Sequence, residues 1–192
     1  MEKEMKNTPG NSRTRTITIC ETAISVALAL VLSYLKVKPV ASGGSIDLVM
    51  IPLVYIAVRR GLPWGIGAGF VFGTLKFFFA NGFAFNWQSM VFDYSVAYAF
   101  VGFAGLVRNT SPGKYAVGAV IGGLLRFVIH FISGITIYAQ WMPEEFLNIT
   151  MTNTWVYSAL YNGTYMIPNI IIAALLTPFI GKALEKIRYG EA

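Results

Sequence analysis

The stretch LLRFVIHFISGITIYAQW, residues 124–141, is apolar enough for a membrane-spanning helix, yet it carries an arginine and the chain's only histidine. Four of its residues recur at every fourth position and form one stripe on such a helix: Arg126, His130, Gly134 and Tyr138. Ionisable side chains at membrane depth are costly and usually face a cavity or a protein partner. Each of the four alone would suit ion pairing or packing. Together they indicate a binding surface, with Gly134 leaving room for a ligand or a backbone.

The composition is that of an integral membrane protein with one membrane domain. Of the 192 residues, 55% are hydrophobic and only 12% are charged, whereas a soluble domain carries about 25% charged residues. The single cysteine, Cys20, excludes an internal disulfide framework, and no motif indicates a metal site or a cofactor. The basic residues lie mostly at the ends of apolar segments, so the net charge of +6 does not indicate nucleic-acid binding.

The order of apolar segments predicts an all-α bundle of six transmembrane helices. Residues 1–16 are polar and predict a disordered cytoplasmic tail, and residues 17–189 form the membrane domain. A helix needs about 20 apolar residues to cross about 30 Å of hydrocarbon. The expected helices are 17–37, 46–58, 62–79, 87–107, 115–139 and 155–187. The second is the shortest, and the last is long enough to contain a break near Gly163 or Pro168.

The distribution of basic residues predicts that both termini are cytoplasmic. Eleven lysines and arginines fall on the side of the termini, and three, Lys36, Lys38 and Lys76, fall on the other side. Tryptophans 87, 141 and 155 fall at outer helix ends, as in an aromatic belt.

The first predicted helix carries small residues on one side, at Ala23, Ala27 and Ala29. Such a surface allows close contact with another helix. It suits either docking of a partner or packing within the bundle, and the sequence alone does not separate the two.

Polar residues from different helices share one predicted membrane depth, in the outer half of the bundle. They are Asp47, Asp93, His130, Tyr138, Tyr157 and Asn162. Convergent polar groups among aromatic side chains are typical of a small-molecule pocket. We expect this pocket to open outward, beneath the first, third and fifth connections.

The residue types suggest a flat organic cation as the ligand. Two carboxylates supply counter-charge, and nearby rings supply stacking and cation–π attraction: Phe83, Trp87, Tyr94, Tyr138 and Tyr157. Asn162 offers a donor and an acceptor to the edge of a heterocycle. Arg126 is expected either to neutralise a carboxylate or to lie below the ligand and hold Asp93 in place.

Four stretches of the sequence carry a resemblance to a known family. They are two long motifs, LLRFVIHFISG (124–134) and WVYSALYNGTYMIP (155–168), and two short ones, RRG (59–61) and FDY (92–94). Over residues 17–187 the chain resembles the thiamine-specific substrate-binding (S) components of energy-coupling factor (ECF) transporters. The resemblance implies a non-enzymatic, multi-pass protein of the bacterial plasma membrane that captures thiamine from outside with high affinity. It also implies an ECF module as partner, made of a transmembrane scaffold subunit and two ATPase subunits, besides membrane lipid.

The resemblance also implies roles for individual residues. Family binding residues match Asp47, Asp93, Tyr94, Arg126, His130, Tyr138, Tyr157 and Asn162, and the family's docking face matches Ala23 and Ala27. Both acids are aspartates where glutamate is usual, one methylene longer. The loop before Asp47 lacks a tryptophan that some members stack on the ligand, and Trp87 or Phe83 is expected to compensate.

Two other functions are weighed against this one. A self-sufficient secondary carrier for an organic cation or vitamin is the main alternative, although no inverted repeat of broken helices is visible. An intramembrane enzyme is disfavoured, because Ser133 and His130 lack an activating base-and-orienter set and no phosphate-binding loop of the Walker type exists.

Overall fold

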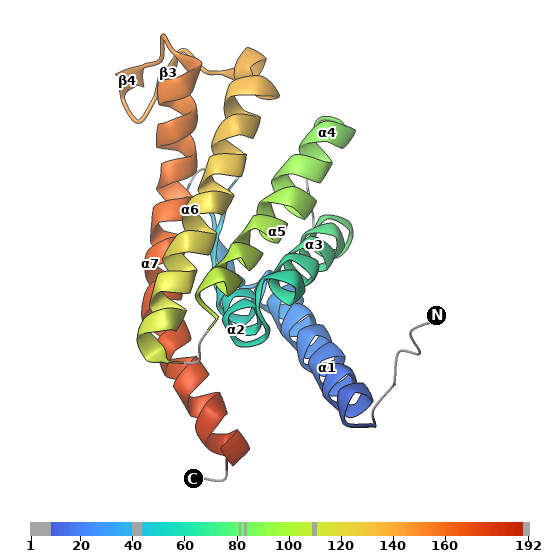
Figure 1. Ribbon diagram of the computed structural model, residues 1–192. Coiled ribbons are helices and arrows are strands. Elements are labelled where there is room, and N and C mark those ends of the chain that lie inside the picture. The colour runs from blue at the N-terminus through green and yellow to red at the C-terminus, as the bar shows by residue number, and fades with distance from the viewer. Residues whose placement is uncertain (1–8, 40–43, 81, 83, 109–110, 190–192) are drawn as a thin grey trace, which may run out of the picture.

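The fold of the chain is a bundle of helices, seen in a computed structural model (Figure 1) that describes residues 9–39, 44–80, 82, 84–108 and 111–189. The long helices are α1 (Pro9–Leu32), α2 (Met50–Arg60), α3 (Leu62–Phe79), α6 (Pro112–Thr136) and α7 (Thr154–Tyr189). A composite helix is built from α4 (Trp87–Met90), the π-helical η1 (Val91–Val96), α5 (Ala97–Val101) and the 3₁₀-helical η2 (Gly102–Val107). A short 3₁₀ turn, η3 (Ala139–Trp141), follows α6.

Two short antiparallel hairpins complete the described chain. β1 (Lys36–Val37) pairs with β2 (Ile46–Asp47), so that Lys36 lies opposite Asp47. β3 (Glu145–Phe146) pairs with β4 (Ile149–Thr150) at the far end of α7 from its C-terminus. Both residues of its two-residue turn have positive φ, as a type I′ hairpin requires.

Five helical segments of the described chain are long and apolar enough to cross a membrane: Ser12–Leu32, Leu62–Phe79, Trp87–Val107, Pro112–Thr136 and Thr154–Ile187. The bundle of membrane helices is thus confirmed. The second helix is shorter than predicted, because α2 has 11 residues and so reaches only about 16 Å. The hairpin strand β2 takes up the start of the predicted helix, and Gly61, with φ 90°, ends it. α2 instead lies at the centre of the core, where Val54, Ile56 and Val58 are 0% exposed.

Two helix boundaries differ from those predicted. α1 already begins at Pro9, and the Thr16 and Thr18 hydroxyls donate to carbonyls one turn back; residues 1–8 lie outside the described residues. α7 continues as one helix through Pro168, with no break there or at Gly163. Membrane helices tolerate proline because neighbouring groups satisfy the freed carbonyls.

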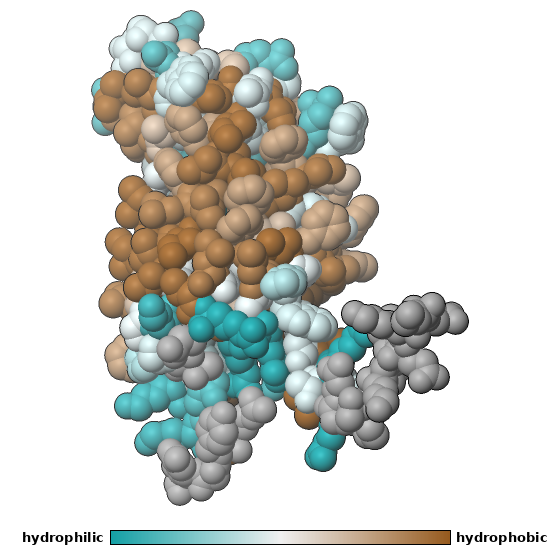
Figure 2. Space-filling model, in the orientation of Figure 1, coloured by the Kyte–Doolittle hydropathy of each residue, from teal (hydrophilic) through white to brown (hydrophobic). Residues whose placement is uncertain are grey.

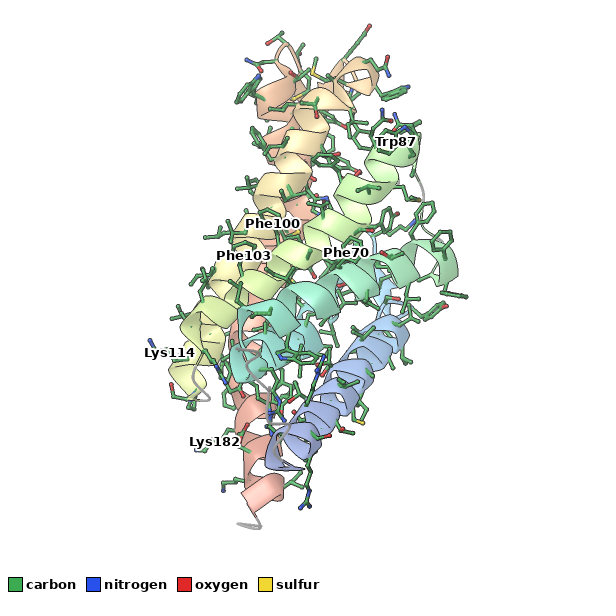
Figure 3. The ribbon with its side chains drawn as sticks, turned by 45° about the vertical axis from the view of Figure 1, so that its right-hand side comes forward. Phe70, Trp87, Phe100, Phe103, Lys114 and Lys182 are labelled. Carbon is green, nitrogen blue, oxygen red and sulfur yellow. The ribbon has the colours of Figure 1, made fainter. Side chains whose placement is uncertain are left out.

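A wide apolar band crosses the middle of the face that Figure 2 shows, and polar side chains gather at its two ends. The first turn of α1 and the last turn of α7 lie at the same end (Figure 1). Figure 3 shows Lys114 and Lys182 at that end and Trp87 at the opposite one. Ala23 and Ala27 are exposed on α1, whereas Ala29 is buried and does not share their face.

Buried ion pairs join three helices at the end that holds the helix termini. Arg59 of α2 pairs with Glu185 of α7 and with Glu21 of α1, the latter at 3.2 Å, and Arg60 pairs with Glu21 at 2.5 Å. This network fixes the C-terminal end of α2 between α1 and α7.

The charge bias predicts which end faces the cytoplasm. In a Cys20→Ser background, a cysteine replacing Glu145 should react with a membrane-impermeant maleimide in intact cells. A cysteine replacing Lys114 should react only after permeabilisation, because both positions are exposed but lie at opposite ends. The reverse labelling pattern would show that the termini lie outside.

Candidate functional site

A cavity of about 650 Å³ lies between the first, third and fifth connections and the ends of α3, η1, α5, α6 and α7. This volume is within the range of about 300–1,000 Å³ typical of small-molecule sites. Eight of the predicted ligand-binding residues line it: Asp93, Tyr94, Arg126, His130, Gly134, Tyr138, Tyr157 and Asn162. The three connections expected to cover the pocket all contribute to its lining, through residues such as Ser45, Phe85 and Trp141.

Three predicted residues lie elsewhere. Asp47 does not line the cavity but bonds to Lys76, which does. Trp87 is 69% exposed on the outer surface of α4 and does not line the cavity. Phe83 lies outside the described residues.

The Asp93 carboxylate is held at the cavity wall by two partners, a histidine and a tyrosine. Its Oδ1 lies 3.3 Å from His130 Nδ1, and its Oδ2 accepts a hydrogen bond of 2.8 Å from the Tyr138 hydroxyl. Burial, together with the Asp93 charge, raises the pKa of the Tyr138 hydroxyl, which therefore remains a donor. Asp93 lies in the π-helical turn η1, an irregularity that is frequent at functional sites.

A chain of polar contacts forms one wall of the cavity beneath Asp93. Lys76 Nζ donates to Asp47 Oδ2 at 3.0 Å and to the Tyr98 hydroxyl at 2.5 Å. Arg126 Nη2 donates to the same hydroxyl at 2.9 Å, with its guanidinium 4.1 Å from the centre of the Tyr98 ring. Among the described residues Arg126 forms no ion pair with a carboxylate, since Lys76 pairs with Asp47 and Arg126 stacks on Tyr98.

Several buried polar atoms of the site have no hydrogen-bond partner within the described part of the chain. They are Nε and Nη1 of Arg126 and Nε2 of His130. Buried donors and acceptors are normally satisfied, because leaving one unpaired costs about 1–3 kcal/mol. Polar groups of a ligand in the cavity would satisfy them.

Aromatic side chains cover the cavity at the end away from the helix termini and along α7. The Phe85 ring stacks on Trp141, with 4.2 Å between centroids, and meets Tyr138 edge-on at 5.5 Å. On α7, Tyr161 and Tyr165 follow Tyr157 into the lining. The four-residue spacing of these three tyrosines is a signal that sequence reasoning could have used, as it did for residues 126–138.

Gly134 brings α6 and α7 close together at the cavity. A Cβ at this position would lie 2.1 Å from the Ser158 hydroxyl oxygen. Ser158 donates to the Phe131 carbonyl at 2.9 Å, and the Asn162 amide donates to the Ser158 carbonyl at 2.9 Å. The Asn162 oxygen accepts from the Tyr165 hydroxyl at 2.5 Å. Asn162 is thereby held in a fixed orientation.

Lysines at the cavity rim were missed as site residues, because their positions suggested only a role in topology. Lys36 donates to the Ala80 carbonyl at 3.3 Å, and burial, with the nearby Lys76 and Lys38 charges, lowers its pKa. Lys38 is exposed at the same rim. No group of three or more metal-ligating side chains occurs among the residues that the structure describes.

A cavity of this size lined by polar and aromatic side chains, in a bundle with several candidate membrane spans, is typical of a membrane protein that binds a small molecule. Residues 19–188 match the family model described as "Thiamine transporter protein (Thia_YuaJ)". The chain belongs to this thiamine transporter family, whose members are non-enzymatic multi-pass proteins of the bacterial cell membrane.

Individual relatives agree with this assignment. The chain is 33% identical over 180 residues to the thiamine transporter ThiT of Bacillus subtilis (strain 168), covering 86% of this chain and 91% of that protein. It is 31% identical over 181 residues to ThiT of Lacticaseibacillus paracasei, covering 84% and 87%. The solved structure of ThiT from Listeria monocytogenes has the same fold, with a TM-score of 0.77 at 24% identity, covering 90% of this chain and 97% of that one.

The buried Asp47–Lys76 pair should stabilise the ligand-free protein. The Asp47 side chain is fully buried, so Lys76→Met leaves an unpaired carboxylate and should lower the free energy of unfolding by about 3–5 kcal/mol. The double variant Asp47→Asn/Lys76→Met should recover most of this loss, since asparagine can still accept the bond from the Val49 N–H. Denaturant unfolding in detergent measures both variants.

Lys38→Met is the matched control, because it makes the same substitution at an exposed lysine that also lines the cavity. A double variant no more stable than Lys76→Met alone would show that the pair is not coupled.

Proposed function

We propose that this chain is the high-affinity thiamine-binding subunit of an ECF-type vitamin transporter, and that a separate ATPase-driven module supplies the energy for uptake. The observation that carries the proposal is the Asp93 carboxylate, placed at the wall of a ring-lined cavity with a histidine and a tyrosine as partners and, among the described residues, no lysine or arginine. The relatives from B. subtilis and L. paracasei are named thiamine transporters, which supports thiamine as the ligand.

The charges of the site suit a monocation such as thiamine. Among the described residues Asp93 has no lysine or arginine partner, so its charge is available to the thiazolium ring. Lys76 is already paired with Asp47, and Arg126 already stacks on Tyr98. The tyrosines of α7 and the Phe85–Trp141 stack supply faces for both rings of thiamine.

The unpartnered atoms of the site suit the polar groups of thiamine. If His130 Nδ1 carries the proton toward Asp93, its Nε2 is an acceptor, which matches an exocyclic amino group of the pyrimidine. The free N–H groups of Arg126 match the hydroxyl of the ethanol substituent.

The assignment to an ECF transporter, and not only to a thiamine transporter, is based on the exposed small residues of α1. Ala23 and Ala27 are both exposed on this helix, so they are not needed for packing within the bundle. Small residues on an exposed helix face allow another membrane helix to approach closely. We assign this face to the scaffold subunit of the module. A self-sufficient carrier remains the alternative, and the two differ in whether the chain transports alone.

Replacing Asp93 with asparagine should weaken thiamine binding. Loss of a charged hydrogen-bond partner is worth about 1.5–3 kcal/mol, or about 10–150-fold in Kd. The loss should be greater for thiamine than for a neutral analogue without the cationic ring, and the ligand-free protein should keep its melting temperature. Tryptophan-fluorescence titration measures the two affinities.

Glu144→Gln is the control for this variant, since it removes the same charge from an exposed site outside the cavity. Unchanged thiamine affinity in Asp93→Asn, or a destabilised ligand-free protein with equal losses for both ligands, would show that Asp93 is structural.

Transport should require the module. The purified chain should bind thiamine one-to-one in liposomes without accumulating it. Ala23→Trp or Ala27→Trp should abolish uptake by cells while leaving thiamine affinity intact, because the added ring blocks docking and touches no core.

Leu124→Trp, on the exposed face of α6, is the matched control and should transport normally. Uptake by the chain alone would instead favour the self-sufficient carrier, and equal loss of binding in the alanine variants would show that the alanines only pack the bundle.

A further inference from the structure

A second, smaller cavity lies at the opposite end of the molecule from the thiamine cavity. It has a volume of about 320 Å³ and lies where α1, the end of α2, the start of α3 and the end of η2 meet. Six residues line it: Thr14, Arg15, Thr18, Arg60, Trp64 and Arg108.

The lining of this cavity consists of hydrogen-bond donors. Arginine and the tryptophan indole can only donate, threonine can donate, and none of the six is acidic. Among the described residues, Arg60 is balanced by Glu21, whereas Arg15 and Arg108 have no ion-pair partner. Two uncompensated guanidinium groups therefore border the same cavity. A ligand with several acceptor oxygens and negative charge, such as a phosphate group, fits this lining.

The fold positions one of these arginines through a glycine. Gly61 has φ 90°, and a Cβ at this position would lie 3.2 Å from Arg108 Cδ. The Arg108 side chain thus lies across the turn between α2 and α3. The packing of Arg108 on this turn therefore positions its guanidinium group beside the cavity.

The surroundings of the cavity indicate a lipid as the source of the phosphate. The neighbouring residues Leu106 and Ile17 are exposed apolar side chains, 59% and 40% exposed. They lie two positions from Arg108 and Arg15 in the sequence. The Trp64 ring in the lining, together with these exposed side chains on the two elements that carry the arginines, offers apolar surface to an acyl chain whose headgroup enters the cavity. Basic pockets between membrane helices are known to hold anionic headgroups in this way.

We propose that this cavity binds the phosphate of an anionic phospholipid, such as phosphatidylglycerol, between Arg15, Arg60 and Arg108. The bound headgroup bridges α1 to the α2–α3 turn and to the end of η2. This site is distinct from the thiamine cavity, since the two share no lining residue.

The test compares matched double variants of the purified full chain in neutral detergent. Arg15→Gln/Arg108→Gln removes the two uncompensated charges. Lys114→Gln/Lys182→Gln removes the same charge from exposed residues at the same end, outside the cavity (Figure 3). Each protein is titrated with dioctanoyl phosphatidylglycerol, dioctanoyl phosphatidylcholine or inorganic phosphate, and the melting temperature is followed.

Phosphatidylglycerol should raise the melting temperature of the natural chain and of the lysine variant. The arginine variant should need about 30-fold more of this lipid for the same rise in melting temperature. Each basic residue near the headgroup contributes about 1 kcal/mol to lipid binding, and this variant lacks two of them. Phosphatidylcholine and inorganic phosphate at equal concentrations should have little effect on any protein. Thiamine affinity is measured in parallel and should be unchanged in the arginine variant. Unchanged affinity shows that the arginine variant is folded.

If phosphatidylglycerol raises the melting temperature of the two double variants equally, the proposed site is wrong, because such a result shows a general effect of surface charge. Equal protection by inorganic phosphate and by phosphatidylglycerol would overturn the lipid assignment in favour of a free anion.

Discussion

The larger cavity depends on a chain of hydrogen bonds that crosses the bundle. Asn169 of α7 accepts from the Asp47 N–H at 2.9 Å, and Asp47 accepts from Lys76 of α3 at 3.0 Å. The Tyr98 hydroxyl then links Lys76 to Arg126 of α6. Charged groups in an apolar bundle are tolerated only when they are paired and hydrogen-bonded. Because each link comes from a different element, pairing these groups also fixes where those elements lie, and the cavity is the space left above them.

The sequence predicted the parts of this site that lie along one helix. The four-residue spacing placed Arg126 and His130 on one face, and the structure has both at the cavity. It did not predict partners across helices. Lys76 was expected only on the side opposite the termini, because spacing along one helix does not show that this residue meets Asp47 from another element. Arg126 was expected to meet an acid for the same reason, and its actual partner, Tyr98, was not considered.

Local signals also explain which aromatic residues face the cavity. Asn86 and Ser89 form a capping box at the start of α4, in which the Ser89 N–H donates to the Asn86 side chain at 2.8 Å. This cap makes Trp87 the first helical residue and leaves its ring outside, whereas Phe85, before the cap, stacks on Trp141. The pattern Asn-x-x-Ser was present in the sequence. Which ring a short connection turns inward still depends on the partner it stacks on, which lies 56 residues further along the chain.

The position of α2 follows from the same need to pair buried charges. A helix of 11 residues is too short to cross the membrane, so its own length does not fix its depth. Its N-terminal end follows Asp47, whose carboxylate accepts from the Val49 N–H at 3.3 Å. Its C-terminal end carries Arg59, which pairs with both Glu21 and Glu185. Moving α2 along its axis in either direction would leave a charge unpaired at one end. The helix is therefore held between the polar wall of the cavity and the ion pairs of α1 and α7, and its apolar side chains can form the core around which the longer helices pack.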